Sequence, residues 1–399
     1  MKPLGGSLAG VRVWDGERDL GPVTVHWRAD RIEAVDPAED LHPGLTVVPG
    51  LVDTHVHLDT SVLDGAGPGD AWPLVTPPEE KALHVAAHTQ RFAAAGITTL
   101  RDLASSPVQM AVARSLSAGV LPGARLVTAG AVGMTAGHGD LFTPPRFRER
   151  PPVADTPDEC RRLVRQWARE GSQHIKVYCS GGILSMGDQV GWRNQTRAEL
   201  EATLDEAHAL GMLVAAHTHT ATGIDLALDL GVDSVEHATG LVPRQFDRLL
   251  ERQVPVAPTI LVNDLVAAGG PGIRPEARDK ARAATGARDE VFAAAGAAGV
   301  RFVLGTDANA RFVGYGDQFS EVHRMRELFG WDAARALRSA TSDAAAAIGL
   351  GDSVGRLAPG YVPDLLLVRG TPWQDIEDLR TENVVAVLSR GRLVAGELP

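Results

Sequence analysis

Cysteine is nearly absent from this chain, which contains only Cys160 and Cys179 among 399 residues. Two thiols in a chain of this length cannot form a disulfide framework, and a reducing cytoplasm fits them best. The N-terminal residues lack the apolar stretch of a signal peptide, and no apolar run is long enough to span a bilayer. We therefore expect a cytoplasmic protein with no membrane partner.

Lysine is also scarce, and no cluster of basic residues stands out, which argues against a nucleic-acid partner. The chain carries 39 Lys and Arg against 50 Asp and Glu, a net charge of −11, and its acidic excess is spread out. Hydrophobic residues make up 44% of the sequence, enough for a large core. The length favours one barrel-type domain beside a smaller one, and the composition is compatible with a homo-oligomer.

From Val47 to about Ala347, short β-branched runs alternate with helical stretches rich in Ala, Leu, Arg and Glu. Eight strands alternating with helices predict an α/β fold, a (β/α)₈ TIM-type barrel whose active site lies at the carboxyl ends of the strands. The expected strands are 46–54, 97–102, 124–129, 174–179, 213–218, 233–237, 254–260 and 300–306. One of the helices expected between them spans 275–298.

The two ends of the chain have a different pattern, with short strands and tight turns. Neither end has enough strands for a stable sheet core of its own. We predict that residues 1–50 and 350–399 form one small composite β-sandwich, and that residues 51–349 form the barrel.

The stretch Asp53-Thr54-His55-Val56-His57 follows an apolar run that reads as a buried strand. Side chains two apart on a strand face the same side, so His55 and His57 would project together from the strand's carboxyl end. Two imidazoles presented in this way are suited to bind one divalent metal ion. The alternative is a pair of polar residues that merely leave a strand for a loop.

Lys176 lies inside the otherwise apolar strand His174-Ile175-Lys176-Val177-Tyr178. A buried lysine is costly unless it is neutral or paired with an acid. One interpretation is a buried ion pair. The other is a lysine kept neutral by burial, which can react with carbon dioxide to give a carbamate able to bridge two metal ions.

Three later strand ends supply further candidate ligands. His217 and His219 face the same side of one strand, and we choose His217 as the ligand. The next strand ends in His237, and the last ends in Asp307. Taken alone, Asp307 would favour the interpretation of a helix N-cap. Together with the earlier residues, however, these positions predict a metal site at the mouth of the barrel.

At this point the sequence resembles the metal-dependent amidohydrolase superfamily over essentially its whole length. Within it, the chain is most similar to the branch that contains prolidase-type (Xaa-Pro dipeptidase-like) and imidazolonepropionase-related enzymes. The narrower likeness is carried by Thr99-Leu100-Arg101-Asp102-Leu103, Gly137-His138-Gly139-Asp140, Ile175-Lys176-Val177 with Ser180-Gly181-Gly182, and Val235-Glu236-His237.

The resemblance implies two divalent metal ions, with zinc favoured by nitrogen and carboxylate ligands. His55, His57 and Asp307 would hold the more buried ion. His217 and His237 would hold the second, and carbamylated Lys176 would bridge the two.

A binuclear site implies hydrolysis by a metal-bridging hydroxide that attacks an amide carbonyl. Asp307 would shuttle the proton from the attacking water to the leaving nitrogen. His138, Tyr178 and His219 are candidate donors to the oxyanion. Each also has an ordinary structural interpretation: a loop hydrogen bond for His138, barrel lining for Tyr178 and ligand support for His219.

Three further residues are expected near the site. Arg101 and Asp102 end the second barrel strand, and we expect them to form an ion pair that orients the ligands. Arg193 would bind a substrate carboxylate if the stretch after the fourth strand folds over the barrel mouth.

We expect an enzyme, a metal-dependent peptidase-like hydrolase of C–N bonds that cleaves a small peptide or an N-acyl amino acid. A specialised peptide-processing role in secondary metabolism, such as the follower-peptide removal of bottromycin-type pathways, would suit the resemblance. One alternative is a one-metal cyclic amidohydrolase or deaminase in which Lys176 is an ordinary lysine. Another is a non-catalytic scaffold, against which the intact ligand set argues.

Overall fold

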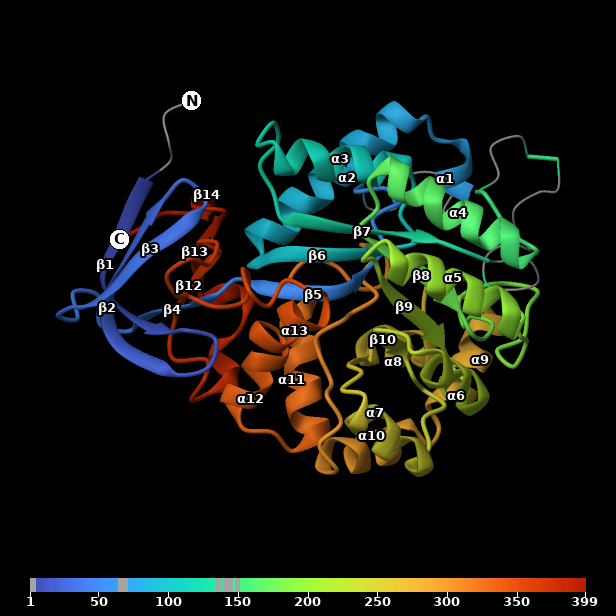
Figure 1. Ribbon diagram of the computed structural model, residues 1–399. Coiled ribbons are helices and arrows are strands. Elements are labelled where there is room, and N and C mark those ends of the chain that lie inside the picture. Colours follow the sequence, from blue (N-terminus) through green and yellow to red (C-terminus); the bar gives the residue numbers. More distant parts are fainter. Residues whose placement is uncertain (1–4, 64–70, 134–137, 139–145, 148–150) are drawn as a thin grey trace.

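The protein is described by a computed structural model covering residues 5–63, 71–133, 138, 146, 147 and 151–399 (Figure 1). The two ends of the chain contribute to one seven-stranded sheet, of order β14-β13-β12-β4-β1-β2-β3. Its strands are β1 (Gly5–Trp14), β2 (Asp19–Arg28), β3 (Arg31–Pro37), β4 (Leu45–Pro49), β12 (Leu365–Arg369), β13 (Val384–Ser389) and β14 (Arg392–Gly396).

Strand β4 joins the two ends of the chain within this sheet. It pairs in parallel with β1, Arg12 opposite Thr46, and antiparallel with β12, Leu45 opposite Arg369. Apolar side chains of β1–β3 and of β12 and β13 share one buried cluster. The two halves of the sheet therefore enclose a common core, which is the small β-sandwich predicted from the sequence. In Figure 1 the blue and red segments lie side by side on the left of the molecule.

A second, parallel sheet of seven strands forms the barrel, in the order β11-β10-β9-β8-β7-β6-β5. Its strands are β5 (Leu51–Val56), β6 (Ile97–Leu103), β7 (Arg125–Ala131), β8 (His174–Tyr178), β9 (Leu213–Thr218), β10 (Ser234–His237) and β11 (Val256–Ala257). Nearly every residue of these strands is buried, as expected for a parallel sheet covered by helices.

The segment from Phe302 to Ala308 occupies the place of the eighth strand and closes the barrel. It touches its neighbours through two isolated parallel bridges, Val256 with Phe302 and Val56 with Ala308. Backbone hydrogen bonds from Thr54 to Leu304 and from His57 to Ala308 support the second junction. The predicted TIM-type barrel is thus confirmed, although its last strand is held without a regular ladder.

The helices surround the barrel, and they begin where the sequence offers caps. Ser106, Thr156 and Thr196 accept hydrogen bonds from the first turns of α3, α4 and α5. The helices are α1 (Trp72–Val75), α2 (Pro78–Ala94), α3 (Pro107–Ser117), α4 (Pro157–Glu170), α5 (Arg197–Ala209), α6 (Ala221–Leu230), α7 (Phe246–Glu251), α8 (Ile260–Ala268), α9 (Pro275–Thr285), α10 (Arg288–Ala297), α11 (Asp317–Phe329), α12 (Ala333–Ser339) and α13 (Ser342–Ala347), with the 3₁₀ turns η2 (Pro243–Gln245), η3 (Ile376–Asp378) and η4 (Thr381–Asn383).

Three expected elements differ in the structure. The strand expected at 46–54 is two strands, because the chain passes from one sheet to the other at Gly50. A Cβ at Gly50 would lie 2.3 Å from the Thr98 side chain, so only glycine allows this crossing. The strand expected at 254–260 shortens to β11, since helix α8, which the sequence pattern missed, already begins at Ile260. The helix expected at 275–298 is divided into α9 and α10.

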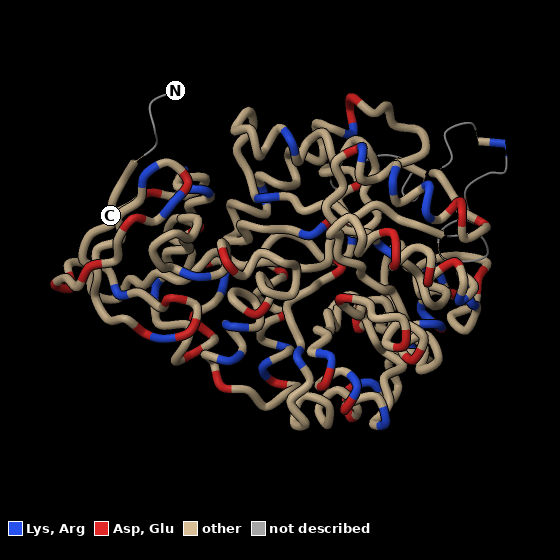
Figure 2. Tube along the Cα trace, viewed as in Figure 1, with Lys and Arg blue, Asp and Glu red and all other residues tan. Residues whose placement is uncertain are grey.

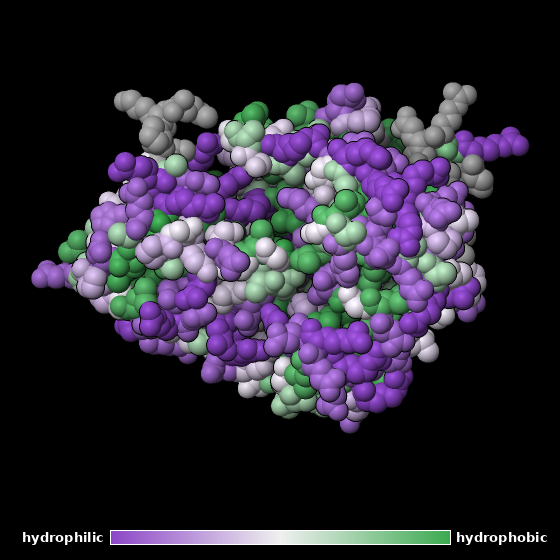
Figure 3. All heavy atoms as spheres, in the orientation of Figure 1, coloured by the Kyte–Doolittle hydropathy of each residue, from purple (hydrophilic) through white to green (hydrophobic). Residues whose placement is uncertain are grey.

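The surface carries charges of both signs, interspersed along the chain (Figure 2). On the face drawn in Figure 3, hydrophilic residues predominate and hydrophobic ones form small groups between them. Among the described residues, none of the helices is both long and apolar enough to cross a membrane.

Candidate metal centre

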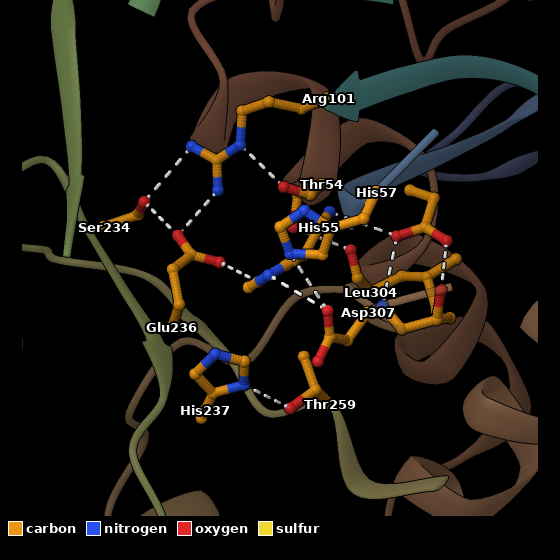
Figure 4. Close-up of polar contacts among 12 residues, drawn as sticks. Thr54, His55, His57, Arg101, Ser234, Glu236, His237, Thr259, Leu304 and Asp307 are labelled. Atoms are coloured by element: carbon orange, nitrogen blue, oxygen red, sulfur yellow. Dashed lines mark hydrogen bonds and ion pairs between the residues drawn. The ribbon is translucent and has the colours of Figure 1, made fainter. Parts of the chain in front are cut away.

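The predicted ligands lie at the carboxyl ends of the barrel strands. His55 is on β5 and His57 follows it directly, and their Nε2 atoms lie 3.5 and 3.2 Å from Oδ1 of Asp307. Asp307 lies near the end of the eighth barrel segment, and its backbone N–H donates to the carbonyl of His55. The i, i+2 spacing therefore brings both imidazoles to one carboxylate, as the sequence predicts (Figure 4).

A buried acid, Glu236, fixes the orientation of the His55 ring through a hydrogen bond to its Nδ1. The Nδ1–H of His55 donates to Glu236 Oε2 over 2.8 Å, while Glu236 Oε1 accepts from Arg101 over 2.7 Å and from Ser234 over 2.5 Å. Burial by itself would raise the pKa of Glu236, but the charge of Arg101 and the His55 hydrogen bond lower it. Glu236 is therefore ionised, and Nε2 of His55 is left free to bind a metal.

The ion pair expected between Arg101 and Asp102 is wrong. Neighbouring residues on a strand face opposite sides, so Arg101 points towards Glu236 and the carbonyl of Thr54, whereas Asp102 accepts from the backbone N–H of Leu58. Burial raises the pKa of Asp102 to about 7. Sequence reasoning missed Glu236 as the partner, although a glutamate inside the buried strand Ser234–His237 was a signal that some cation must face it.

Lys176 is 1% exposed on β8, and its charge lowers the pKa of both His55 and His217. Burial lowers the pKa of its ammonium group to about 8, although Glu236 and Asp307 act in the opposite direction. Within the part of the chain that the structure describes, its Nζ has no hydrogen-bond partner. Lys176 therefore makes no direct ion pair with an acid among the described residues. Its lowered pKa favours the neutral amine.

A second group of potential ligands comprises His217, His219 and His237, all buried, whose candidate donor atoms lie within 4.8 Å of one another. The Nε2–H of His217 donates to the carbonyl of Gly181 over 3.1 Å, which leaves its Nδ1 as a free acceptor. Nδ1 of His237 hydrogen-bonds with Thr259 Oγ1 over 2.8 Å. His237 also belongs to a group with His55 and Asp307, so it links the two sets of ligands.

These residues fit the divalent metals that amidohydrolases generally use. Nε2 of His55, Nδ1 of His217 and Nζ of Lys176 are buried atoms without hydrogen-bond partners in the described chain. Orphaned polar atoms of this kind are costly unless something else binds them. A cluster of neutral imidazoles with one carboxylate is a donor set suited to zinc or a similar ion.

The backbone is strained at the same place. His237, Ala238, Thr259 and Asp307 have φ angles of 66, 53, 47 and 58°, in the left-handed region that favours glycine. Such conformations cost of order 1–3 kcal/mol each and tend to gather at functional sites. Here they turn the ends of β10, β11 and the eighth segment inwards, towards the histidines.

The three candidate oxyanion donors also lie among these rings. His138 stacks on His217 at 4.1 Å between ring centroids and lies 4.8 Å from Tyr178. His219 stacks on His237 at 4.6 Å. Burial lowers the pKa of His138 and of His219 to about 3, so both rings are neutral.

Two other sequence features were also singled out near the site. Arg193, the candidate for binding a substrate carboxylate, is exposed on the loop after β8. In the motif around His138, Gly137, Gly139 and Asp140 lie outside the described residues. The ring of His138 packs closely on the loop after β8, since a Cβ on Gly182 would lie 2.0 Å from its Nδ1.

The chain matches the model of the amidohydrolase family over residues 46–394. Among curated proteins it is similar to ochratoxinase of Aspergillus niger, with 28% identity over 381 residues that cover 90% of this chain and 77% of the relative.

Solved structures give the same result. A Xaa-Pro dipeptidase with methionine bound in its active site aligns with a TM-score of 0.86 and 28% identity, covering 98% of this chain and 100% of that one. The crystal structure of A. niger ochratoxinase aligns with a TM-score of 0.85 and 26% identity, covering 99% and 96%. With its barrel, its strand-end ligands and these relatives, the chain belongs to the amidohydrolase family and is a hydrolase that acts on amide bonds.

Proposed function

We propose that this enzyme uses two divalent metal ions, most simply zinc, to hydrolyse the amide bond of a small peptide or an N-acyl amino acid. His55, His57 and Asp307 would hold the first ion, His217 and His237 the second, and carbamylated Lys176 would bridge them. The observation that carries this proposal is the buried Nζ of Lys176, which has no hydrogen-bond partner among the described residues and whose charge acts on His55 of one ligand group and His217 of the other.

Bound divalent ions would acidify a water molecule, whose pKa can fall from ~15.7 towards ~7, and polarise the scissile carbonyl. Asp307 would receive the proton of that water and pass it to the leaving nitrogen. Burial would raise the pKa of Asp307, but hydrogen bonding to His57 and the charges of His55 and His57 lower it to about 2. Its carboxylate is therefore an acceptor at neutral pH.

The developing negative charge on the amide oxygen needs donors besides the metal. Tyr178 and His219 are buried and His138 is partly buried, all three lie beside His217, and they carry N–H or O–H groups. Donors already fixed in a dry site cost no reorganisation during the reaction. We propose that at least one of the three contacts the oxyanion.

The relatives suggest the substrate class. One is an ochratoxinase, one a Xaa-Pro dipeptidase with bound methionine, and another a prolidase solved with N-methylphosphonate-L-proline (TM-score 0.87, 28% identity, covering 98% of this chain and 99% of that one). Dipeptides and N-acyl amino acids are therefore the first substrates to test. Arg193 stays our candidate for the substrate carboxylate, and follower-peptide removal stays a prediction for the same screen.

Elemental analysis of protein produced with added bicarbonate tests the metal centre. We expect about two zinc equivalents, which fall to one or less in Lys176→Ala. One equivalent that Lys176→Ala leaves unchanged would favour the one-metal alternative and move the screen to cyclic amides and deamination. Absence of both metal and amide hydrolysis would contradict the proposal.

A further inference from the structure

His219 has a position that the proposed metal centre does not use. It follows β9, two residues after His217, and its side chain is only 6% exposed. We infer that His219 is a third histidine ligand of the second metal ion, so that His217, His219 and His237 form a three-nitrogen site. This inference deepens the proposed function and rests on it.

The geometry of the three rings supports a shared ion. Their candidate ligand atoms all lie within 4.8 Å of one another. The ring of His217 stands edge-on to both others, with centroids 4.8 Å from His219 and 4.7 Å from His237. Three imidazoles converging from two neighbouring strands are a donor set typical of a zinc site with an open position.

Each ring is also held by its outer nitrogen. His219 hydrogen-bonds through Nδ1 with Thr239 Oγ1 over 3.0 Å, much as His237 does with Thr259 over 2.8 Å. The outer nitrogen of His217 donates to a backbone carbonyl. Partners of this kind set the tautomer and the direction of metal-binding histidines. For His219 they leave Nε2 as the ligand atom.

A ligand role and an oxyanion role for His219 make different demands on Nε2. A metal ligand presents a lone pair there, whereas an oxyanion donor presents a hydrogen atom. The bond to Thr239 accommodates the first role, because the threonine hydroxyl can accept Nδ1–H. Three protein nitrogens would also make the second site independent of the carbamate on Lys176.

The test uses the full-length variant His57→Ala with Lys176→Met, which removes ligands of the first site and the bridge. His57 is partly exposed, and methionine is unbranched like lysine but has no amine that could be carbamylated. Titration with Co²⁺, followed by its visible absorption and by equilibrium dialysis, should show one bound ion. Adding His219→Gln should weaken Co²⁺ binding more than about 100-fold, since loss of a supporting partner alone costs 10–100-fold.

Two further variants complete the design. Thr239→Val keeps the ring and removes only its supporting hydroxyl, so we expect Co²⁺ binding about 10–100-fold weaker. His174→Gln is the matched control: His174 is another buried histidine on a barrel strand, at the start of β8, and Co²⁺ binding should not change. Thermal unfolding of the metal-free variants checks folding, and Thr239→Val carries the test if His219→Gln does not fold.

Unchanged Co²⁺ affinity in His219→Gln, or in Thr239→Val where the glutamine variant is unfolded, would overturn the inference. The proposed function fails separately, if the natural sequence binds no metal and hydrolyses no amide. A protein that holds two ions and loses one on His217→Ala, but not on His219→Gln, would keep the proposed function and reject only His219 as a ligand.

Discussion

At the scale of single residues, the site depends on side chains that hold other side chains in place. Glu236 joins His55 to Arg101 and Ser234, and Gly182 leaves the space that the ring of His138 fills. The bonds of Glu236 to His55 and Arg101, and the contact of Gly182 with His138, link residues far apart in the chain. Each can be removed by a small substitution, which makes its contribution measurable.

Glu236→Gln should weaken metal binding by the site that contains His55. The amide has no charge to balance Arg101, and it can no longer hold His55 as a carboxylate does. We expect an affinity about 10–100-fold lower, measured by competition with a chelating dye. Glu327→Gln, which changes an exposed acid, is the control. Equal affinity in the two variants would show that Glu236 does not orient the ligand.

Gly182→Ala should displace His138. The new methyl group would lie 2.0 Å from Nδ1 and 2.4 Å from Cε1 of the imidazole, so the ring must move. If His138 contacts the oxyanion, kcat should fall about 100-fold. Gly191→Ala is a matched control on the same loop, because nothing lies within 4 Å of its Cβ position. Full activity in Gly182→Ala would exclude His138 from catalysis.

At the scale of elements, the loop after β8 is fastened to helix α9. Lys280 Nζ donates to Asp188 Oδ1 over 2.6 Å and to the carbonyl of Ser185 over 2.7 Å. Asp188 Oδ2 accepts from the backbone N–H of Gly182 over 3.0 Å. Asp188 is 1% and Lys280 13% exposed, so water screens this pair little. The pair therefore holds the glycine that faces His138.

The ion pair between Asp188 and Lys280 should make the stability of the folded protein depend on pH in the acid range. Burial would raise the pKa of Asp188, but Lys280 and the Gly182 N–H lower it below the ordinary value of 3.8. The folded state thus binds fewer protons than the unfolded state, and the stabilisation is present above about pH 4 and lost as the pH falls further. Thermal unfolding from pH 3 to 7 should show a steeper acid decline in the natural sequence than in Asp188→Asn with Lys280→Met. Parallel curves would contradict this.

The sequence pattern predicted the elements and ligands that depend on nearby residues. Strand ends follow from local alternation, and parallel strands bring their ends together, so the convergence of five residues could be predicted without a structure: His55, His57, His217, His237 and Asp307. Contacts between distant segments were not predictable. The pairing of Arg101 with Glu236 spans 135 positions, and α8 begins at Ile260 because Glu321, 61 residues later, accepts its first N–H.

At the scale of the whole molecule, the residues of the candidate metal centre come from both the first and the last barrel strand. His55 is on β5 and Asp307 is in the closing segment. Any ion bound there connects the first strand to the last. The eighth segment joins its neighbours through isolated bridges and separate backbone hydrogen bonds instead of a regular ladder, and a bound ion would add to that junction.

Removal of metal should therefore lower the melting temperature. An ion present at 100 times its dissociation constant stabilises the folded state by about 2.7 kcal/mol. We expect chelation to lower Tm by several degrees and added Zn²⁺ to restore it, as measured by calorimetry. The variant His55→Ala with His217→Ala should respond to neither treatment. An identical response in that variant would show that the effect arises elsewhere.

Strand β4 has a consequence for synthesis of the chain. It is made early, but one of its neighbours, β12, contains residues 365–369. Until those residues leave the ribosome, β4 has an unpaired edge, the kind of surface on which incomplete chains aggregate. A ribosome that stalls before this point releases a product with most of the barrel but an open sheet. We expect chaperones to bind such a product and proteases to degrade it. Cells would then contain the full-length enzyme and little of the incomplete form.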